Sequence, residues 1–575
     1  MELNSVLHFM NESYAYKVAD HQYLIRLRTN KNAFKSVKLR YIDKYLREHD
    51  MPDQPIFTKE MVKVATNDFH DYYEIVISDV FVYKKFTMNA LAWRYYFILE
   101  QDDETIYYGN YKFFTKEPHI TIDMFSLVIH QANRSFFEVP EWTKGAIFYQ
   151  IFPERFAATN DEVSDNWNEA AFVPMSRTNG TLRGIIQKVD YLKKLGVDAI
   201  YINPIFLANT CHRYDTVDYL TIDPKLGTDE DLKELVDVYH KNGIKVVLDL
   251  VFNHSGIHFF AFEDVIKNQE KSKYKDWYCI NEFPISTDMK TWPPKYQSFA
   301  YGFGMPKFDT DNPECRNYLL GVTRHYLEKF NIDGYRLDVA DEVTHSFWRD
   351  FRKVCKEINK DCLIMGEVWY ESSPYMRGDE WDSIMNYNFF DETRAFLNEE
   401  ITTHEYINRL ERERGEMGQT YYHNSNILLG THDTDRLFSA IGEDKDKYMM
   451  AMSLLFFLPG APIIYYGDEI MLKGKNPSEA RSGMTFDPHF NKDVRDTISN
   501  LMNLKHEQVL KIGEVRIKEV GTKSIHITRF NEDDEIHMYI ALEELNLESL
   551  KGKVNLYNHQ EFDGILKEKQ ILIYR

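Results

Sequence analysis

Eight short apolar runs, separated by stretches long enough for amphipathic helices, constrain the fold of this chain more than any other feature. Each run has the length of a buried β-strand, and strands that alternate with helices indicate parallel βαβ units. Eight such units over about 360 residues fit a closed (β/α)8 TIM barrel with insertions. The runs are Ala146–Phe152, Ala199–Pro204, Val246–Phe252, Gly334–Val339, Leu363–Val368, Ile384–Phe389, Ile427–Gly430 and Pro462–Tyr466.

Two β-rich regions flank the predicted barrel, as expected for a chain of 575 residues, which is too long for one core. Residues 1–125 alternate in short strands such as Tyr23–Arg28 and predict an N-terminal β-sandwich. The barrel is expected over 140–505, with an inserted loop domain over 254–312 after its third strand. Alternation returns over 506–575 and predicts a C-terminal β-domain.

The net charge and the cysteine pattern limit the classes of binding partner and the cellular compartment that we expect. The net charge of −21 argues against a nucleic-acid partner or an anionic membrane surface. No apolar run approaches the roughly 20 residues that span a bilayer. The five cysteines have no C-x-x-C spacing and fit free thiols in a reducing cytosol. The N-terminus has no signal-peptide pattern, so we expect a cytoplasmic protein.

Ionisable residues close the third, fourth, fifth and seventh apolar runs, where a barrel of this type carries its catalytic groups. Arg336 and Asp338, two residues apart, share one strand face, and the guanidinium should hold the pKa of Asp338 low. Each residue alone has an ordinary structural explanation, but their combination suits glycoside hydrolysis, which needs one carboxylate nucleophile and one carboxylic acid. The residues are Asp249, His254, Arg336, Asp338, Glu367, His432 and Asp433.

In this order the motifs resemble those of the α-amylase family of retaining glycoside hydrolases. The resemblance implies that Asp338 is the nucleophile, that Glu367 is the general acid and then the base, and that Asp433 stabilises the transition state. Arg336 would orient the nucleophile. The other residues assigned to substrate binding are His254, His432, His212, Tyr214 and Trp369, with Glu342 and Arg436 toward the acceptor side.

Further segments resemble the neopullulanase, cyclomaltodextrinase and maltogenic amylase subfamily. They are Met305–Phe308 in the excursion, Ala146–Phe156 at the first strand, and the N-terminal region. The resemblance implies a homodimer formed through that region and a partly covered pocket. Such a pocket would favour cyclodextrins, short maltooligosaccharides and pullulan, cleaved at α-1,4 and also at α-1,6 bonds, with transglycosylation as a side reaction.

The chemistry requires no cofactor, but the resemblance raises the question of calcium. Thr181 stands where a Gly-Gly-Asp motif would supply a calcium ligand. Calcium prefers six to eight oxygen ligands. The remaining candidate ligands are Asn160, Asp161, Asp165 and Asn166.

Two other interpretations stay open. A catalytically inactive, amylase-like glucan-binding protein would usually lack one of the carboxylates, and all three are present here. A sucrose- or trehalose-acting relative is less consistent with the N-terminal region and with Met305–Phe308. The main hypothesis is therefore an α-glucan hydrolase.

Overall fold

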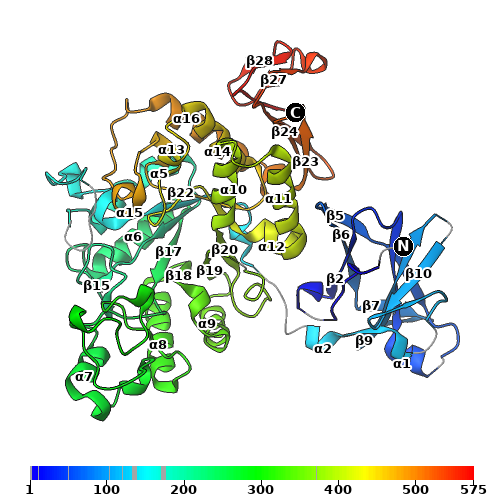
Figure 1. Ribbon diagram of the computed structural model, residues 1–575, viewed down its shortest axis with the longest axis horizontal. Helices are drawn as coiled ribbons and strands as arrows, with labels where there is room; N and C mark the ends of the chain where they lie inside the picture. Colours follow the sequence, from blue (N-terminus) through cyan, green and yellow to red (C-terminus); the bar gives the residue numbers. More distant parts are fainter. Residues whose placement is uncertain are drawn as a thin grey trace. The chain divides into compact units, whose positions relative to one another are not determined.

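The computed structural model of the chain describes residues 3–10, 12–49, 51–102, 104–118, 121–132, 139–169, 177–370 and 372–575 (Figure 1). It contains two compact units. The first comprises Met1–Glu138, Ser372–Asp382 and Ile407–Tyr422, and the second comprises Val139–Glu371, Ser383–Tyr406 and His423–Arg575.

The first unit contains two larger antiparallel sheets and the two-stranded pair β7–β8. One has the order β1-β2-β6-β5, and the other has the order β11-β10-β9-β3-β4 with β12 also paired to β9. Alternate residues of β9, among them Trp93, Tyr95 and Phe97, are fully buried in one core with Tyr23 and Leu27 of β2. This arrangement confirms the predicted β-sandwich. The bounds are β1 Ala15–Ala19, β2 Gln22–Asn30, β3 Ser36–Asp43, α1 Lys44–Glu48, β4 Ile56–Glu60, β5 Val62–Thr66, β6 His70–Ser78, β7 Val80–Tyr83, β8 Phe86–Asn89, β9 Ala92–Gln101, β10 Glu104–Gly109, β11 Lys112–Phe114, β12 Phe125–Val128 and α2 Ile129–Ala132.

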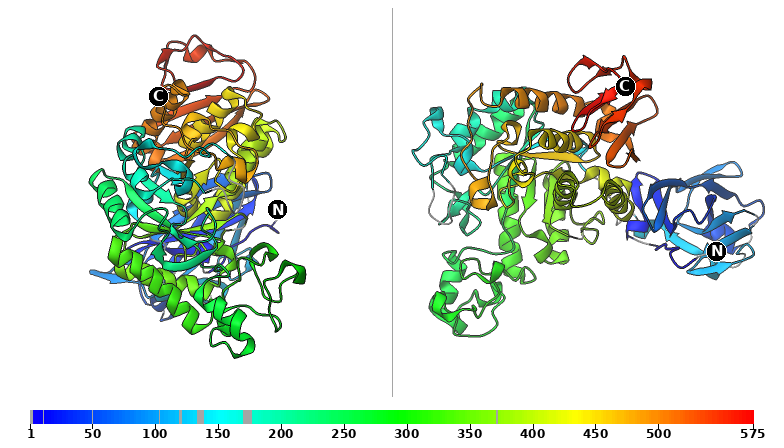
Figure 2. Two further views of the ribbon diagram at one scale, coloured as in Figure 1. Left: turned by 90° about the vertical axis from the view of Figure 1, so that its left-hand side faces the viewer. Right: turned by 45° about the horizontal axis from the view of Figure 1, so that its top comes forward.

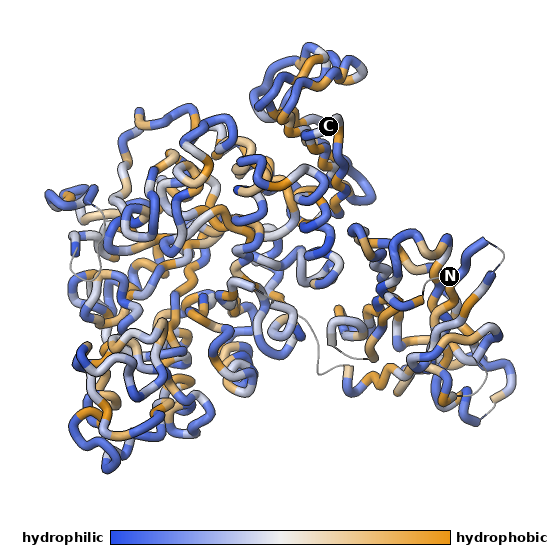
Figure 3. Tube along the Cα trace, viewed as in Figure 1, coloured by the Kyte–Doolittle hydropathy of each residue, from blue (hydrophilic) through white to orange (hydrophobic). Residues whose placement is uncertain are grey.

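The second unit is built on a closed parallel barrel of eight strands, in the order β13-β14-β17-β18-β19-β20-β21-β22. Each strand falls within or overlaps one of the eight predicted apolar runs, so the barrel prediction is confirmed. The strands are buried because helices cover the barrel from outside, and Figure 3 shows apolar segments running through the interior of this unit. The bounds are β13 Phe148–Ile151, β14 Ala199–Ile202, β17 Lys245–Leu250, β18 Gly334–Leu337, β19 Leu363–Val368, β20 Ser383–Asn386, β21 Asn426–Leu428 and β22 Ala461–Tyr465.

Local sequence sets the ends of the helices that follow residue 139, among which α11 and α12 belong largely to the first unit. Helix α6 begins with a capping box between Thr228 and Asp231. Helix α8 begins with the side-chain cap of Asn312 and ends at Asn331, which adopts a left-handed conformation. The bounds are α3 Pro153–Phe156, α4 Leu182–Ile186, α5 Val189–Leu195, α6 Asp229–Lys241, α8 Pro313–Phe330, α9 His345–Ile358, α10 Tyr387–Leu397, α11 Thr403–Met417, α12 Gln419–Asn424, α13 Leu437–Ala440, α14 Lys445–Phe457, α15 Asn476–Ala480, α16 Lys492–Lys505 and α17 Gln508–Ile512.

Two further parts belong to the second unit. The excursion after β17 carries α7 (Phe260–Asn268) and is tied back to the barrel by a bridge between His254 and Lys307. The C-terminal strands lie at the opposite end of this unit from α7 (Figure 2). They form the sheet β23 (Glu514–Val520), β24 (Ser524–Phe530), β25 (Glu535–Ile540) and β30 (Ile571–Tyr574), with the pairs β26 (Leu545–Asn546) with β29 (Ile565–Leu566) and β27 (Val554–Asn555) with β28 (Gln560–Glu561). β15 (Phe206–Ala208) and β16 (Thr216–Ile222) form a hairpin after β14. Within the described ranges, no helix combines the length and the apolar character needed to cross a bilayer.

Candidate active site

A cavity of about 570 Å³ opens among the C-terminal ends of the barrel strands. It brings together residues of β19, of the segments that follow β18, β21 and α15, of the excursion, and of the loop between β15 and β16. All three predicted carboxylates line it. The lining residues are His212, Tyr214, His254, Phe299, Met305, Asp338, Val339, Asp341, Glu342, Glu367, Trp369, Tyr370, Asp433 and Arg481.

The guanidinium of Arg336 is the centre of the carboxylate cluster. Strand register sets Arg336 directly beside Asp249 of β17. Its Nη1 donates to Asp249 at 2.9 and 3.0 Å and to Asp338 Oδ1 at 2.9 Å. Its Nη2 forms an ion pair with Glu367 Oε2 at 2.7 Å. Because Arg336 is fully buried, this one fork fixes the two carboxyl groups relative to each other.

The electrostatics of Asp338 differ from the sequence prediction of a low pKa. Burial raises the pKa of Asp338 well above its ordinary value, although Arg336 opposes the rise. The carboxyl groups of Glu367 and Asp249 raise it further, since one cation is divided among three acids. The prediction was wrong because it counted only the neighbour in sequence. A cluster with this charge imbalance favours retention of a proton, as a carboxylate paired with a carboxylic acid requires.

Glu367 is held from three sides. Its Oε2 also accepts the main-chain N–H of Val339 at 2.9 Å, and its Oε1 accepts the indole N–H of Trp369 at 3.1 Å. Val339 has φ of +44°, which is strained for a β-branched residue. Trp369 in turn stacks on Tyr387 with centroids 3.8 Å apart. The strained turn at Val339 and the stacked ring of Trp369 therefore each place a hydrogen-bond donor next to the carboxyl group of Glu367.

Asp433 also lines the cavity, between two basic side chains. Its Oδ1 accepts from Arg481 at 2.9 Å, and its Oδ2 lies 3.0 Å from His432 Nε2. The side-chain amide of Gln150 donates to His432 Nδ1 at 2.8 Å, which leaves the ring proton on Nε2. Burial lowers the pKa of His432 well below its ordinary value, so the ring is neutral. Tyr214 stacks on it with planes 8° apart.

Two further histidines offer neutral hydrogen-bonding groups to the cavity. Burial lowers the pKa values of His212 and His254 to about 3. His254 stacks on Phe299 with centroids 5.4 Å apart. Its buried Nε2 has no hydrogen-bond partner among the described residues. A buried polar nitrogen in a cavity wall normally has a partner, so this atom is suited to a ligand hydroxyl.

Three residues assigned to substrate binding do not line the cavity. Arg336 and His432 lie directly behind lining side chains, as described above. Arg436 is fully buried, and its guanidinium donates to Tyr466 O at 2.7 Å, to Ala480 O at 2.9 Å and to Asp468 at 3.1 Å. These contacts hold it away from the cavity surface, so its predicted place on the acceptor side has no support in the structure.

Several residues at or behind the cavity wall were not identified as site residues from the sequence. Asp249, already noted at the end of the third run, does not line the cavity and is buried against Arg336. Besides Arg336, it accepts hydrogen bonds from Tyr214 at 2.9 Å and Tyr201 at 3.0 Å. Arg481 and Phe299 come from segments with no strand-end pattern, so no sequence signal indicated them.

Three of the four candidate calcium ligands bond to other side chains in the structure. Asp161 pairs with Lys188 at 2.5 Å, and the side chain of Asn160 bonds to a glutamine. Asn166 Oδ1 accepts a serine hydroxyl, and Asp165 is exposed. In the part of the chain that the structure describes, no group of three or more His, Cys, Asp or Glu side chains is arranged to hold a metal ion. Calcium binding at these four residues therefore stays a prediction from the sequence.

Comparison with known proteins agrees with this geometry. The family described as the alpha amylase catalytic domain matches residues 150–509, and the alpha amylase N-terminal Ig-like domain matches residues 1–130. The maltogenic alpha-amylase of Bacillus acidopullulyticus is 37% identical, with 93% of this chain and 91% of the relative covered. The intracellular maltogenic amylase of Bacillus subtilis is 32% identical, with 97% of this chain and 96% of the relative covered.

A solved cyclomaltodextrinase structure superposes with a TM-score of 0.86 at 35% identity, covering 95% of this chain and 92% of that one. The chain therefore belongs to the α-amylase family of glycoside hydrolases.

Proposed function

We propose that this protein is a retaining α-glucan hydrolase with Asp338 as nucleophile and Glu367 as acid and base. The observation that carries the proposal is that the single guanidinium of Arg336 binds the carboxyl groups of both Asp338 and Glu367. These two residues line the same cavity as Asp433. Such a linked pair supports retention, because a retaining hydrolase needs its two carboxyl groups about 5–5.5 Å apart.

The reaction would proceed in two steps. Glu367 protonates the glycosidic oxygen while Asp338 attacks the anomeric carbon, and a glycosyl ester forms on Asp338 as the leaving sugar departs. Among the described residues, Oε1 of Glu367 accepts only the indole N–H of Trp369, so it has the free lone pair that can carry this proton. Glu367 then takes a proton from a water molecule whose oxygen attacks the anomeric carbon. The ester bond to Asp338 breaks, and the sugar leaves with its original anomeric configuration. Asp433 and the Nε2 atom of His254 are available for hydroxyls of the distorted ring.

The substrates we propose are cyclodextrins, short maltooligosaccharides and pullulan, with α-1,4 cleavage and a second activity on α-1,6 bonds. The names of the relatives, maltogenic amylase and cyclomaltodextrinase, support this class. Glu342 lines the cavity close to Lys307, whose amine donates to the main-chain oxygen of Glu342 at 2.8 Å. These polar groups could bind an acceptor sugar, which would allow transglycosylation to compete with hydrolysis.

The purified protein should be incubated with β-cyclodextrin, maltotriose, pullulan and soluble starch, alongside the Asp338→Asn variant. Faster cleavage of β-cyclodextrin or maltotriose than of starch, with α-anomers as first products, is expected. We expect Asp338→Asn to lose several orders of magnitude in turnover at an unchanged melting temperature. Absence of turnover on every glucan would instead favour the inactive glucan-binding alternative.

We further propose a cytoplasmic homodimer that assembles through residues 1–125. A relative named as intracellular and five free thiols support the compartment. Light scattering on the full chain should give twice the protomer mass of 68.3 kDa. A single-protomer mass at working concentration would refute the dimer.

A further inference from the structure

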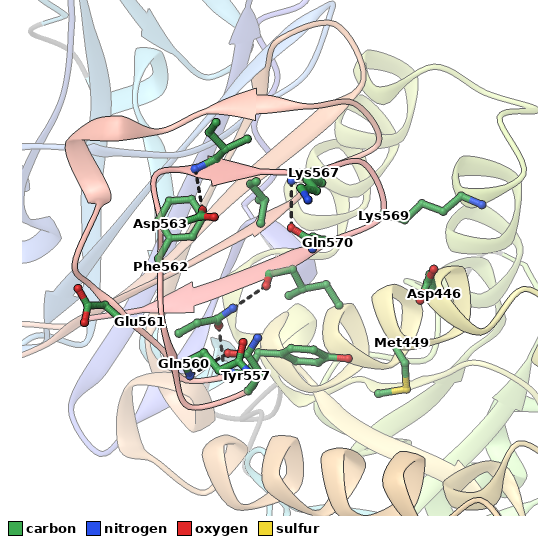
Figure 4. A pocket seen from close by; sticks show the side chains of 15 residues that line it. Asp446, Met449, Tyr557, Gln560, Glu561, Phe562, Asp563, Lys567, Lys569 and Gln570 are labelled. Atoms are coloured by element: carbon green, nitrogen blue, oxygen red, sulfur yellow. Dashed lines mark hydrogen bonds between the residues drawn. The ribbon is translucent and has the colours of Figure 1, made fainter.

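A second cavity lies between helix α14 and the C-terminal strands (Figure 4). Its volume is about 360 Å³, which is within the range of about 300–1,000 Å³ for small-molecule sites. Asp446 and Met449 of α14 form one wall, and residues between Asn555 and Ile571 form the other. It shares no lining residue with the active-site cavity.

An aromatic ring extends across this cavity. Figure 4 shows the ring of Tyr557 reaching from the C-terminal strands toward Met449. The wall behind the ring is held by the buried Asn555, whose Oδ1 accepts the main-chain N–H groups of Tyr557 and Ile573 at 3.0 Å each. Asn555 Nδ2 also donates to Ile571 O at 2.8 Å. These hydrogen bonds of Asn555 fix the backbone that carries the Tyr557 ring.

Polar groups around the ring have unused hydrogen-bonding capacity. The hydroxyl of Tyr557, the side-chain amide of Gln560 and the carboxylate of Asp446 make no hydrogen bond with any other described residue. Burial raises the pKa of Tyr557 to about 12, so its hydroxyl stays a donor at neutral pH. An apolar ring surrounded by free donors and acceptors can pack against one face of a ligand and bond its edge.

The charges of the lining restrict the class of ligand. Asp446, Glu561 and Asp563 face Lys567 and Lys569, and Lys569 is already paired with a further aspartate, Asp444, at 2.6 Å. An anion would meet more negative than positive charge here. No metal-binding group of three or more His, Cys, Asp or Glu is found in the described ranges, so these acids do not form a cation site. A neutral, polyhydroxylated ligand fits the remaining chemistry.

We propose that this cavity is a non-catalytic oligosaccharide site, in which the Tyr557 ring stacks on a sugar of a short α-glucan. The identity of the sugar rests on the proposed function, since a glucan is the neutral polyhydroxylated molecule that this protein would meet. The site itself rests on the cavity, the ring and the free polar groups.

Calorimetric titration of maltotriose into the Asp338→Asn chain tests the proposal, because this background should bind without turnover. Adding Tyr557→Ala should remove one equivalent of bound maltotriose per chain, or weaken it about ten-fold or more. Tyr557→Phe keeps the ring and should retain that equivalent at reduced affinity, which guards against a folding defect. Tyr45→Ala, at an exposed tyrosine elsewhere, is the matched control and should change nothing.

The outcomes separate this inference from the proposed function. Turnover of maltotriose by the unmodified chain, with identical stoichiometry and affinity in the Tyr557→Ala background, would overturn the second site alone. Tyr557-dependent binding by a chain that cleaves no glucan would support the site and refute the hydrolase. Inorganic phosphate binding that depends on Tyr557, in place of maltotriose binding, would overturn the neutral-ligand assignment.

Discussion

Replacing Arg336 by lysine is the most direct perturbation of the catalytic cluster. The guanidinium contacts Asp249, Asp338 and Glu367 within 2.7–3.0 Å from two nitrogens. Lysine keeps the charge but offers one nitrogen in place of the planar fork. One ammonium cannot hold all three carboxyl groups in this arrangement, so the nucleophile and the acid lose their shared support.

The size of the effect follows from these contacts. Misplacing reacting groups by about 1 Å costs about 10²-fold in rate, and losing a preorganised electrostatic contact costs about 10²–10³-fold. Since the two losses overlap, we expect kcat to fall by about 10³-fold. Burial already raises the pKa of Asp338, and weaker pairing raises it further. The ionised fraction therefore falls at a given pH, and the acid limb of the rate profile should move to higher pH.

The assay is kcat and KM for maltotriose between pH 5 and 9, with melting temperatures measured on the same samples. Arg529→Lys is the matched control, because Arg529 is also fully buried but bonds to Phe457 O and Gly513 O. Retention of kcat within a few-fold by Arg336→Lys, with an unshifted acid limb, would refute the role of the fork. A loss of melting temperature larger than that of Arg529→Lys would show that the defect is one of folding.

Three further predictions concern strain and buried charge. Val339→Gly should relieve the strain at φ of +44°, worth about 1 kcal/mol or more, and so raise the melting temperature while kcat falls; an unchanged melting temperature would argue against stored strain. Burial lowers the pKa of Lys505 well below its ordinary value, so the folded state binds fewer protons than the unfolded chain and stability rises as pH approaches about 10.4. Lys505→Met should therefore gain more unfolding free energy at pH 7 than at pH 9.5, and an equal gain in denaturant melts at both would contradict this. Burial lowers the pKa of His254 to about 3, so the unfolded chain takes up an extra proton below its pKa of about 6.5 and stability falls on acidification. His254→Gln should lose less stability between pH 7 and 4.5 than the parent chain in urea titrations, and parallel losses would exclude this histidine.

Residue spacing was sufficient to predict the barrel and the place of its acids. An apolar run of strand length indicates a strand that is buried on both faces. Each of the eight runs corresponds to a strand of the closed barrel. Arg336 and Asp338 could be assigned to one strand face because side chains two apart on a strand point the same way. Asp338, Glu367 and Asp433 could be gathered at one rim because parallel strands end on the same side.

Local periodicity is therefore enough to predict the architecture and the acidic residues at the cavity. How the charge is shared among these residues depends on contacts that form only in the folded chain. Because Arg336 divides its charge among three acids, the effect of burial on Asp338 is larger than the effect of Arg336, and the pKa of Asp338 rises. Arg481 reaches Asp433 from a segment 48 positions along the chain, whereas Arg436 is bound elsewhere. The ion pairs and the pKa of a side chain depend on every charged group within a few ångströms. Many of these groups come from other segments of the chain, and the spacing of residues along one strand does not reveal them.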